Sequence, residues 1–264
     1  MFAHPLQYAT SPRFVWLLAG GVTLLLTILP WLSWRAAPLA ARVSPENCNG
    51  CGRCVADCPF AAVILAPAAN RTGRQAQVFA DLCAGCGICA GACPSSTPFR
   101  TASPIVSGID LPALAVNDLR LRLENALSRL AGAIRVVVFG CDCAVGVSGL
   151  ADRATAAISL PCIGMLPPSF VEYALRNGAE GVLVTGCRAG ECAYRLGTEL
   201  TVARMARERE PHLRASVPPE RLRFAWLGRG DEPDCGAALA RFREALAAAA
   251  QPVARPSKRK LVHA

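Results

Sequence analysis

The sequence predicts an α/β protein built from three successive parts, and three observations lead to that prediction. An uncharged apolar run at 14–34 predicts an N-terminal helix. Two cysteine-rich repeats, at 48–59 and 83–94, predict a small module held together by its cysteines. From residue 134 onward, apolar strand patterns alternate with helical patterns, which predicts a parallel sheet covered by helices.

The N-terminal run FVWLLAGGVTLLLTILPWLSW occupies 14–34. At about 1.5 Å per residue, a helix of this length spans roughly the 30 Å hydrocarbon core of a bilayer. Trp16, Trp31 and Trp34 lie near its two ends, where tryptophans gather at membrane interfaces. We therefore expect a single transmembrane helix at 14–34, preceded by a short N-terminal tail at 1–13.

Basic residues around this run set the expected orientation. Arg35 and Arg42 follow the run, whereas only Arg13 precedes it closely, and this bias favours a cytoplasmic C-terminal part. The expected location is the inner (cytoplasmic) membrane, as a single-pass protein whose C-terminal domains lie in the cytoplasm. The alternative is a cleaved signal peptide, because the alanine-rich segment that ends at Ala41 could be trimmed.

Eight of the 14 cysteines lie in CNGCGRCVADCP at 48–59 and CAGCGICAGACP at 83–94, which share the spacing C-x2-C-x2-C-x3-C-P. Three cysteines at this spacing can wrap one loop around a small inorganic cluster, and a cubane cluster needs four thiolates. The intervening glycines allow the loop to turn tightly. Two alternatives fit less well, because zinc uses four ligands in paired C-x2-C knuckles and a disulfide scaffold needs an oxidising compartment.

These repeats resemble those of bacterial two-cluster ferredoxins over about 44–98. The resemblance implies a ferredoxin-like α+β module at 35–100 that holds two [4Fe–4S] clusters. In such ferredoxins the fourth cysteine of each repeat ligates the cluster of the other repeat. The implied ligands are Cys48, Cys51, Cys54 and Cys93 for the first cluster, and Cys83, Cys86, Cys89 and Cys58 for the second.

The module is expected to contain a β-hairpin and to end near residue 100. Apolar stretches at 61–66 and 75–80 flank a polar, turn-forming segment, which predicts the hairpin. A stretch rich in Ser, Thr and Pro follows the second repeat and indicates a domain boundary. Leucines at helical spacing between 119 and 130 predict an amphipathic helix within a connecting segment at 101–131.

The C-terminal domain, expected at 132–250, carries the parallel sheet. Continuous apolar strands are expected at 134–140, 156–161, 181–186 and 221–228. One helix is expected to begin at Ser169, with Glu172 completing a capping box, and to stop at Gly178. The alternation of strands and helices predicts a small flavodoxin-like, doubly wound α/β domain.

Five further cysteines directly follow the first three of these strands. The carboxyl ends of parallel strands lie at one edge of the sheet, where open α/β folds bind their ligands, so we expect the five thiols to share one crevice. They are Cys141, Cys143, Cys162, Cys187 and Cys192. The favoured interpretation is a [2Fe–2S] cluster, since the ligands come from separate loops. The alternatives are inert buried thiols and a dithiol–disulfide redox centre.

The segment LPCIGMLPPSFVEYALRNGAEGVLVTGCRAGECAYRLGTE, with FGCDC before it and RLRFAWLG after it, resembles the delta subunit family of methyl-viologen-reducing hydrogenases over about 132–250. The resemblance implies a [2Fe–2S] cluster and electron transfer between a redox enzyme and a heterodisulfide-reductase-type or similar iron–sulfur and flavin partner. The matching cysteines are Cys162, Cys187 and Cys192. The family's first pair is usually C-x2-C, whereas Cys141 and Cys143 are one residue closer, so either thiol can take the ligand position. Ala193 stands where the family commonly has a histidine.

The formal net charge of +9 does not indicate nucleic-acid binding. The arginines are scattered and aromatic residues make up 6%, so no basic stripe with stacking platforms is present. The charge is expected to face anionic lipid or an acidic redox partner, and the basic segment 251–264 is expected to form a disordered tail. No G-x-G-x-x-G, P-loop or nucleophile elbow indicates nucleotide binding or hydrolysis.

These observations predict a membrane-anchored iron–sulfur electron-transfer subunit of an oxidoreductase complex, and not a stand-alone catalyst. Three centres would relay electrons between a cytoplasmic redox protein and a membrane partner, expected to be a b-type cytochrome or a quinone-linked subunit. The alternative is a membrane-tethered thiol–disulfide or heterodisulfide oxidoreductase that uses the C-terminal cysteines. A metal-stabilised scaffold without redox function is a third option.

Overall fold

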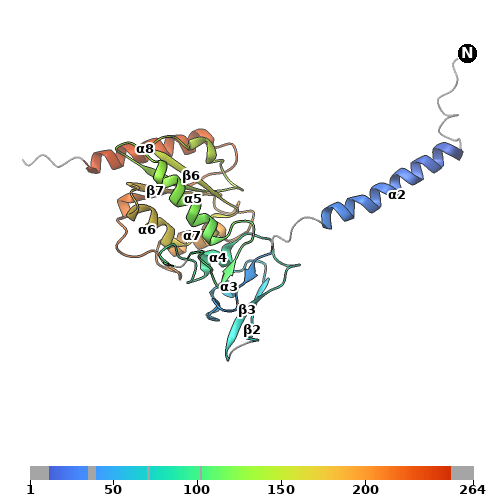
Figure 1. The fold of residues 1–264 in the computed structure, drawn as a ribbon. Helices are drawn as coiled ribbons and strands as arrows, with labels where there is room; N and C mark the ends of the chain where they lie inside the picture. Colours follow the sequence, from blue (N-terminus) through green and yellow to red (C-terminus); the bar gives the residue numbers. More distant parts are fainter. Residues whose placement is uncertain (1–11, 35–39, 70–71, 102, 251–264) are drawn as a thin grey trace, which may run out of the picture. The chain divides into compact units, whose positions relative to one another are not determined.

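A computed structural model describes residues 12–34, 40–69, 72–101 and 103–250 (Figure 1). The chain forms two compact units, residues 1–38 and 39–264. The second unit contains both the cysteine-repeat module and the sheet domain. The expected N-terminal tail falls almost wholly outside the described residues, and the basic tail falls entirely outside them.

Helix α2, Pro12–Trp34, forms where the apolar run predicts a helix. The Thr23 hydroxyl donates a hydrogen bond to the carbonyl oxygen of Ala19 at 2.8 Å. The Thr27 hydroxyl likewise donates to the carbonyl oxygen of Thr23 at 3.0 Å. Across the described residues, however, no helix is both long enough and apolar enough to cross a membrane. The expected transmembrane helix at 14–34, and with it the single-pass location in the inner membrane, is therefore wrong.

The cysteine-repeat module is built from short elements. They are β1 (Arg42–Val43), α3 (Arg53–Ala56), β2 (Val63–Pro67), β3 (Arg74–Val78), α4 (Ile88–Ala92) and β4 (Ile109–Asp110). Strands β2 and β3 pair antiparallel with Val63 opposite Val78, which confirms the predicted hairpin. Gly52 and Gly87 directly precede α3 and α4 with φ of 79° and 76°, a left-handed conformation that glycine adopts without strain.

The sheet domain alternates strands and helices as predicted. Its elements are α5 (Val116–Arg129), β5 (Val136–Cys141), β6 (Thr155–Leu160), α6 (Pro168–Arg176), β7 (Gly181–Gly186), α7 (Gly197–Met205), β8 (Leu222–Trp226) and α8 (Glu232–Ala250). The four strands are parallel in the order β6-β5-β7-β8, which confirms the predicted parallel sheet. This is the flavodoxin-like order, in which the chain changes direction across the sheet between β5 and β7.

Helices cover both faces of this sheet (Figure 1). Side chains alternate along each strand, so neighbouring residues face opposite layers. Val137 packs in one core with Leu119 of α5 and Phe170 of α6. Val138 packs in a second core with Phe242 of α8. Burial on both sides explains why the strands are apolar along their whole length.

The start of α6 differs from the prediction. The helix begins at Pro168, and no side chain caps its first turn. The Glu172 carboxylate instead pairs with Arg176 at 2.6 Å and with Arg214 at 3.4 Å. The predicted capping box at Ser169 and Glu172 is therefore wrong. The Glu172 carboxylate binds the guanidinium groups of Arg176 and Arg214 and does not cap the helix.

Replacing Phe170, which is fully buried, tests the larger core. We expect Phe170→Ala to lower the free energy of unfolding by about 3–5 kcal/mol, through lost burial and the cavity left behind. Phe224→Ala is the matched control, because Phe224 is 42% exposed on the edge strand β8. It should cost about 1 kcal/mol or less. Anaerobic urea denaturation followed by far-ultraviolet circular dichroism measures both, and equal losses would contradict this account of the core.

Candidate metal centres

The first group of thiols lines one small cavity. Its cysteines are Cys48, Cys51, Cys54 and Cys93. The first three come from the loop around α3, whereas Cys93 follows α4 in the other repeat. The structure thus brings together the four residues that the ferredoxin resemblance assigned to one cluster. Cys51 is exposed, so this cavity lies at the surface of the module.

The second group of thiols lines another small cavity. Its cysteines are Cys58, Cys83, Cys86 and Cys89. Here the crossing member is Cys58, which belongs to the first repeat. Each repeat therefore contributes its fourth cysteine to the cavity that the other three cysteines of the opposite repeat line.

Backbone N–H groups point at several of these sulfurs. Ala76 donates to Sγ of Cys48 at 3.4 Å, and Ala62 donates to Sγ of Cys58 at 3.3 Å. A third N–H, from Ala41, lies 3.5 Å from Sγ of Cys83. Such bonds stabilise negative charge on sulfur and tune the potential of a cluster that the sulfurs hold.

The donor sets fit iron–sulfur clusters. Burial, followed by repulsion from neighbouring thiols, raises the pKa of Cys54 to about 12, and burial raises the pKa of Cys86 to about 11. Four thiolates in one small cavity therefore need a cationic core to compensate their charge. No group of three or more His, Cys, Asp or Glu side chains in the described residues is arranged to hold a single metal ion. In both cavities the thiols surround a space, which suits a polynuclear cluster.

The third group of thiols lies at the carboxyl edge of the parallel sheet. Cys141 ends β5, Cys162 follows β6 and Cys187 follows β7, as the strand pattern predicted. The Cys162 thiol contacts both Cys141 and Cys192, and Cys141 also contacts Cys187. The fifth cysteine of the group, in the turn after β5, interacts electrostatically with Cys141 and Cys192.

A glycine makes room for this group. A Cβ atom on Gly197, the first residue of α7, would collide with Sγ of Cys162 and lie 3.1 Å from Sγ of Cys192. Backbone N–H groups from the same turn, those of Gly197 and Thr198, support the Cys192 sulfur. The start of α7 is therefore shaped around two sulfur atoms.

The thiols of this group differ in acidity. A hydrogen bond from the Cys162 thiol lowers the pKa of Cys141 to about 6 and that of Cys192 to about 5, despite burial. The pKa of Cys162 is raised in turn, because its proton bridges these two neighbours. Burial raises the pKa of Cys143 to about 11 and that of Cys187 to about 12. Two of the five thiols are thus stabilised as thiolates by the proton of Cys162, whereas the other three resist deprotonation unless a cation compensates their charge.

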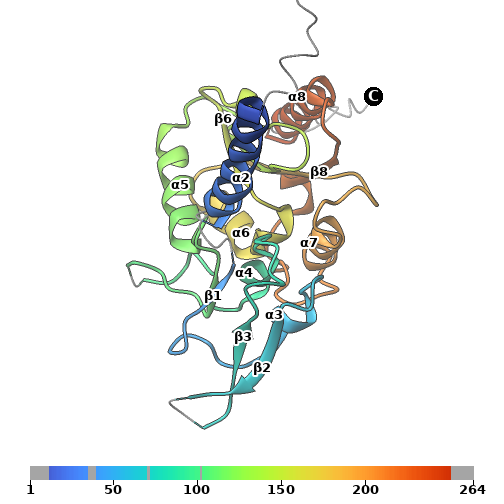
Figure 2. The ribbon, with the colours of Figure 1, turned by 90° about the vertical axis from the view of Figure 1, so that its right-hand side faces the viewer.

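The second and third groups share one apolar cluster at the seam between the module and the sheet domain. Cys86 and Cys162 are both buried in it together with Ile88 and Leu200. Figure 2 shows α4, which lies between Cys86 and Cys93 in the chain, placed between α6 and the β2–β3 hairpin. The aromatic side chain of Tyr194 packs against the same cluster. Burial, followed by the charges of nearby cysteines that include Cys86 and Cys162, raises the pKa of Tyr194.

The first and second groups are also neighbours, since the Cys54 thiol acts electrostatically on Cys89. The three groups therefore form a continuous series through the second unit of the chain. Cys235 stands apart from this series in α8, where it is fully buried.

Sequence reasoning missed two charged residues at the seam. Asp57 and Arg204 are both buried, and their ion pair measures 2.5 Å. Asp57 could have been noticed, because it directly precedes Cys58. Nothing around Arg204 in the sequence distinguishes it from the other arginines.

The crossing of cysteines between repeats can be tested by combining substitutions. Cys51→Ser with Cys93→Ser should lose about as much iron as either single variant, roughly four atoms per chain, because both thiols line the first cavity. Cys51→Ser with Cys58→Ser should lose about twice as much, because its thiols line different cavities.

Iron and acid-labile sulfide in anaerobically purified protein provide the measurement. Cys235→Ser is the control and should leave both contents unchanged, since its thiol lies in none of the three groups. Additive loss in the first double variant would show that Cys51 and Cys93 serve different clusters.

Comparisons with known proteins match both parts of the second unit. The model of the 4Fe-4S dicluster domain matches residues 43–97, and that of the methyl-viologen-reducing hydrogenase delta subunit matches residues 136–249. An iron–sulfur subunit of the F420-non-reducing hydrogenase of Archaeoglobus profundus is 36% identical over 70 residues, which is 26% of this chain and 51% of that protein. The vhc iron–sulfur subunit of the F420-non-reducing hydrogenase of Methanococcus voltae is 28% identical over 74 residues, or 28% of this chain and 51% of that protein.

A longer match includes most of this chain. One subunit of the ferredoxin:CoB-CoM heterodisulfide reductase of Methanosarcina mazei is 28% identical over 204 residues, which is 74% of this chain and 24% of that protein. The chain thus spans about half the length of the hydrogenase subunits and a quarter of the reductase subunit. The two thiol-lined cavities lie in the first matched region and the third thiol group lies in the second. This chain therefore joins a region that matches the 4Fe-4S dicluster domain to a region that matches the delta subunit of methyl-viologen-reducing hydrogenase.

Proposed function

We propose that the chain conducts electrons through three centres in series. A [4Fe–4S] cluster would be held in the first cavity and another in the second, with the ligands named above for each. A [2Fe–2S] cluster would be held by the third thiol group. The observation that carries this proposal is the shared apolar cluster, in which Cys86 of the second group and Cys162 of the third are both buried.

Four of the five C-terminal thiols are proposed as ligands of the third centre. They are Cys141, Cys162, Cys187 and Cys192. Cys141 is preferred over Cys143, because its thiol contacts both Cys162 and Cys187 and is only 2% exposed. The four ligands come from three different strand ends, and a binuclear cluster suits such separate loops.

The two ends of the series are its points of exchange with partners. Cys51 is exposed at the first centre, and Cys192 is half-buried at the third. Electrons would enter at one end and leave at the other, one at a time, because each centre accepts a single electron. The partners proposed are other iron–sulfur or flavin subunits of a hydrogenase-type or heterodisulfide-reductase-type complex, since subunits of such enzymes are relatives of this chain.

The expected b-type cytochrome or quinone-linked partner depended on the transmembrane helix. Without that helix the proposal keeps redox proteins as partners and assigns no membrane component. The described part of the chain gives no observation that would restore one.

A second candidate function is thiol–disulfide exchange at the C-terminal cysteines. One observation favours it: the pKa of Cys192 is lowered to about 5 by the hydrogen bond from Cys162, and a half-buried thiolate is a nucleophile. The chain would then hold two clusters that supply electrons to a dithiol.

Iron content separates the two candidates. Anaerobically purified protein should contain about ten iron atoms per chain if all three centres are present, and about eight if the C-terminal thiols are free. Low-temperature EPR after reduction with dithionite should add a binuclear signal to those of the two cubane clusters. Eight iron atoms together with rapid alkylation of Cys192 would overturn the relay in favour of thiol chemistry.

Substitution of Gly197 tests whether the third centre needs the space beside its sulfurs. We expect Gly197→Ala to lose about two iron atoms and the binuclear signal, because the added Cβ collides with Cys162. The cubane signals should persist. Gly149→Ala is the control, since a Cβ there meets nothing within 4 Å. Retention of the binuclear signal in Gly197→Ala would contradict the assignment of Cys162 and Cys192 as ligands.

A further inference from the structure

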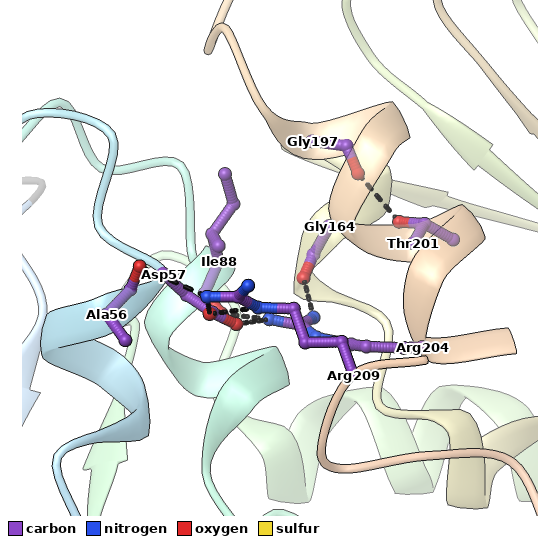
Figure 3. Close-up of polar contacts among 8 residues, drawn as sticks. All are labelled: Ala56, Asp57, Ile88, Gly164, Gly197, Thr201, Arg204 and Arg209. Carbon is purple, nitrogen blue, oxygen red and sulfur yellow. Dashed lines mark hydrogen bonds and ion pairs between the residues drawn. The ribbon is translucent and has the colours of Figure 1, made fainter. Parts of the chain in front are cut away.

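A fully buried arginine lies at the seam between the second and third thiol groups (Figure 3). The side chain of Arg204, near the end of α7, is 0% exposed, and that of Asp57 is 2% exposed. Nη2 of Arg204 lies 2.5 Å from Oδ2 of Asp57. Nη1 donates to the carbonyl oxygen of Gly164 at 2.7 Å, and Nη2 lies 3.3 Å from that of Ile88.

Each of these partners belongs to a segment that carries cysteines. Asp57 directly precedes Cys58, and Ile88 lies between Cys86 and Cys89, so both are part of the second group. Gly164 follows Cys162 by two residues and belongs to the third group. One planar guanidinium therefore joins the backbone of two centres, which a single-point ammonium group could not do.

The charges at the seam do not cancel. Arg209 also binds Asp57, with Nε 2.6 Å from Oδ1, and donates to the carbonyl oxygen of Ala56 at 3.2 Å. Two guanidinium groups thus share one carboxylate. Arg209 is 38% exposed, so water screens its charge, whereas that of Arg204 is enclosed. The enclosed charges of Arg204 and Asp57 balance one another, and the excess positive charge is that of Arg209, which water screens. Loss of the Arg204 charge alone would therefore leave the buried Asp57 carboxylate beside the second group balanced only by a screened charge.

Stability alone does not account for this arrangement. A buried ion pair is often no better than apolar residues of similar volume, because both charges lose their water. Nε of Arg204 is buried without a hydrogen-bond partner among the described residues, which adds to that cost. The pair therefore points to a role for the charge itself.

We propose that Arg204, held by Asp57, is a positioning residue that fixes the second [4Fe–4S] cluster against the C-terminal centre and makes the second cluster easier to reduce. The spatial part of this proposal rests on the proposed function, because it needs a third centre. The electrostatic part needs only the second cluster. Reduction adds one negative charge to the cluster, and a nearby buried positive charge favours that state.

Two substitutions at the ion pair should move the reduction potential in opposite directions. Arg204→Gln removes positive charge and should lower the potential of the second cluster. Asp57→Asn removes negative charge and should raise it. A shift of about 59 mV, tenfold in the reduction equilibrium for one electron, is expected for each. EPR-monitored redox titration of the full chain with both cubane clusters present gives these values.

Three further variants control for misfolding and for general charge effects. Arg209→Gln removes a screened charge from the same carboxylate and should lower the potential less than Arg204→Gln does. The double variant Asp57→Asn with Arg204→Gln leaves no unpaired buried charge, so it should fold even where Arg204→Gln fails, and its potential should lie near that of the unaltered chain. Arg204→Lys keeps the charge and should keep the potential of the second cluster. It loses the two guanidinium nitrogens that bind Asp57, Gly164 and Ile88 at once.

The spatial part has its own measurement. Magnetic coupling between the reduced second cluster and the reduced C-terminal centre should weaken in Arg204→Lys and stay unchanged in Arg209→Gln. Unchanged coupling in Arg204→Lys would overturn the positioning role. Potentials that stay constant, or that shift in the same direction in Arg204→Gln and Asp57→Asn, would overturn the electrostatic role.

The outcomes also separate this inference from the proposed function. If the chain lacks a binuclear signal altogether, the three-centre relay fails, while the potential of the second cluster still tests the charge of Arg204. If the binuclear signal is present and the potentials do not move, the relay stands and this inference fails.

Discussion

The structure depends on how closely the cysteine-repeat module approaches the sheet domain. At their contact, two glycines of the module lie against the turn that follows Cys162. A Cβ on Gly91 would collide with the carbonyl oxygen of Gly164, and one on Gly87 would lie 2.7 Å from Sδ of Met165. Because neither position carries a side chain, α4 can rest on the turn that follows Cys162. The second and third thiol groups can then share one apolar cluster, and the proposed relay between the two domains depends on that contact.

A second constraint is electrical. Buried thiols resist deprotonation, and grouped thiolates repel one another, so the raised pKa of Cys54 and Cys86 expresses the cost of keeping these groups ionised without a cation. Backbone N–H groups reduce this cost at several sulfurs. The iron of a cluster would supply the remaining compensation, and binding of the clusters would then stabilise the fold of the module itself.

Local patterns in the sequence were sufficient for much of this architecture. The spacing of the two repeats predicted a module held by its cysteines, and the resemblance to two-cluster ferredoxins implied which thiols line each cavity. Apolar strands predicted a parallel sheet with Cys141, Cys162 and Cys187 at one edge. In each case the spacing or period is imposed by backbone geometry over a few residues. The cofactor of the third group could not be decided in this way, since five thiols near one another suit more than one chemistry.

The features that sequence could not give depend on partners far along the chain. The spacing of Ser169 and Glu172 matches a capping box, but in the fold the Glu172 carboxylate pairs with Arg214, which lies 42 residues further along the chain. Arg204 binds Asp57 across a separation of 147 residues, and no local pattern records that contact. The transmembrane prediction rested on the absence of charge at 14–34, and no helix in the described residues meets the length and apolarity that a membrane span requires.

The exposure of Cys51 bears on how the protein survives in air. A sulfur open to solvent gives dioxygen and chelators direct access to the iron it would hold, whereas the thiols at the seam are enclosed by Ile88 and Leu200. Oxidative damage should therefore begin at the first thiol group, which contains Cys51, and reach the thiols at the seam last. A partner protein that covers Cys51 would exchange electrons with the first centre and would also protect that centre from oxidation.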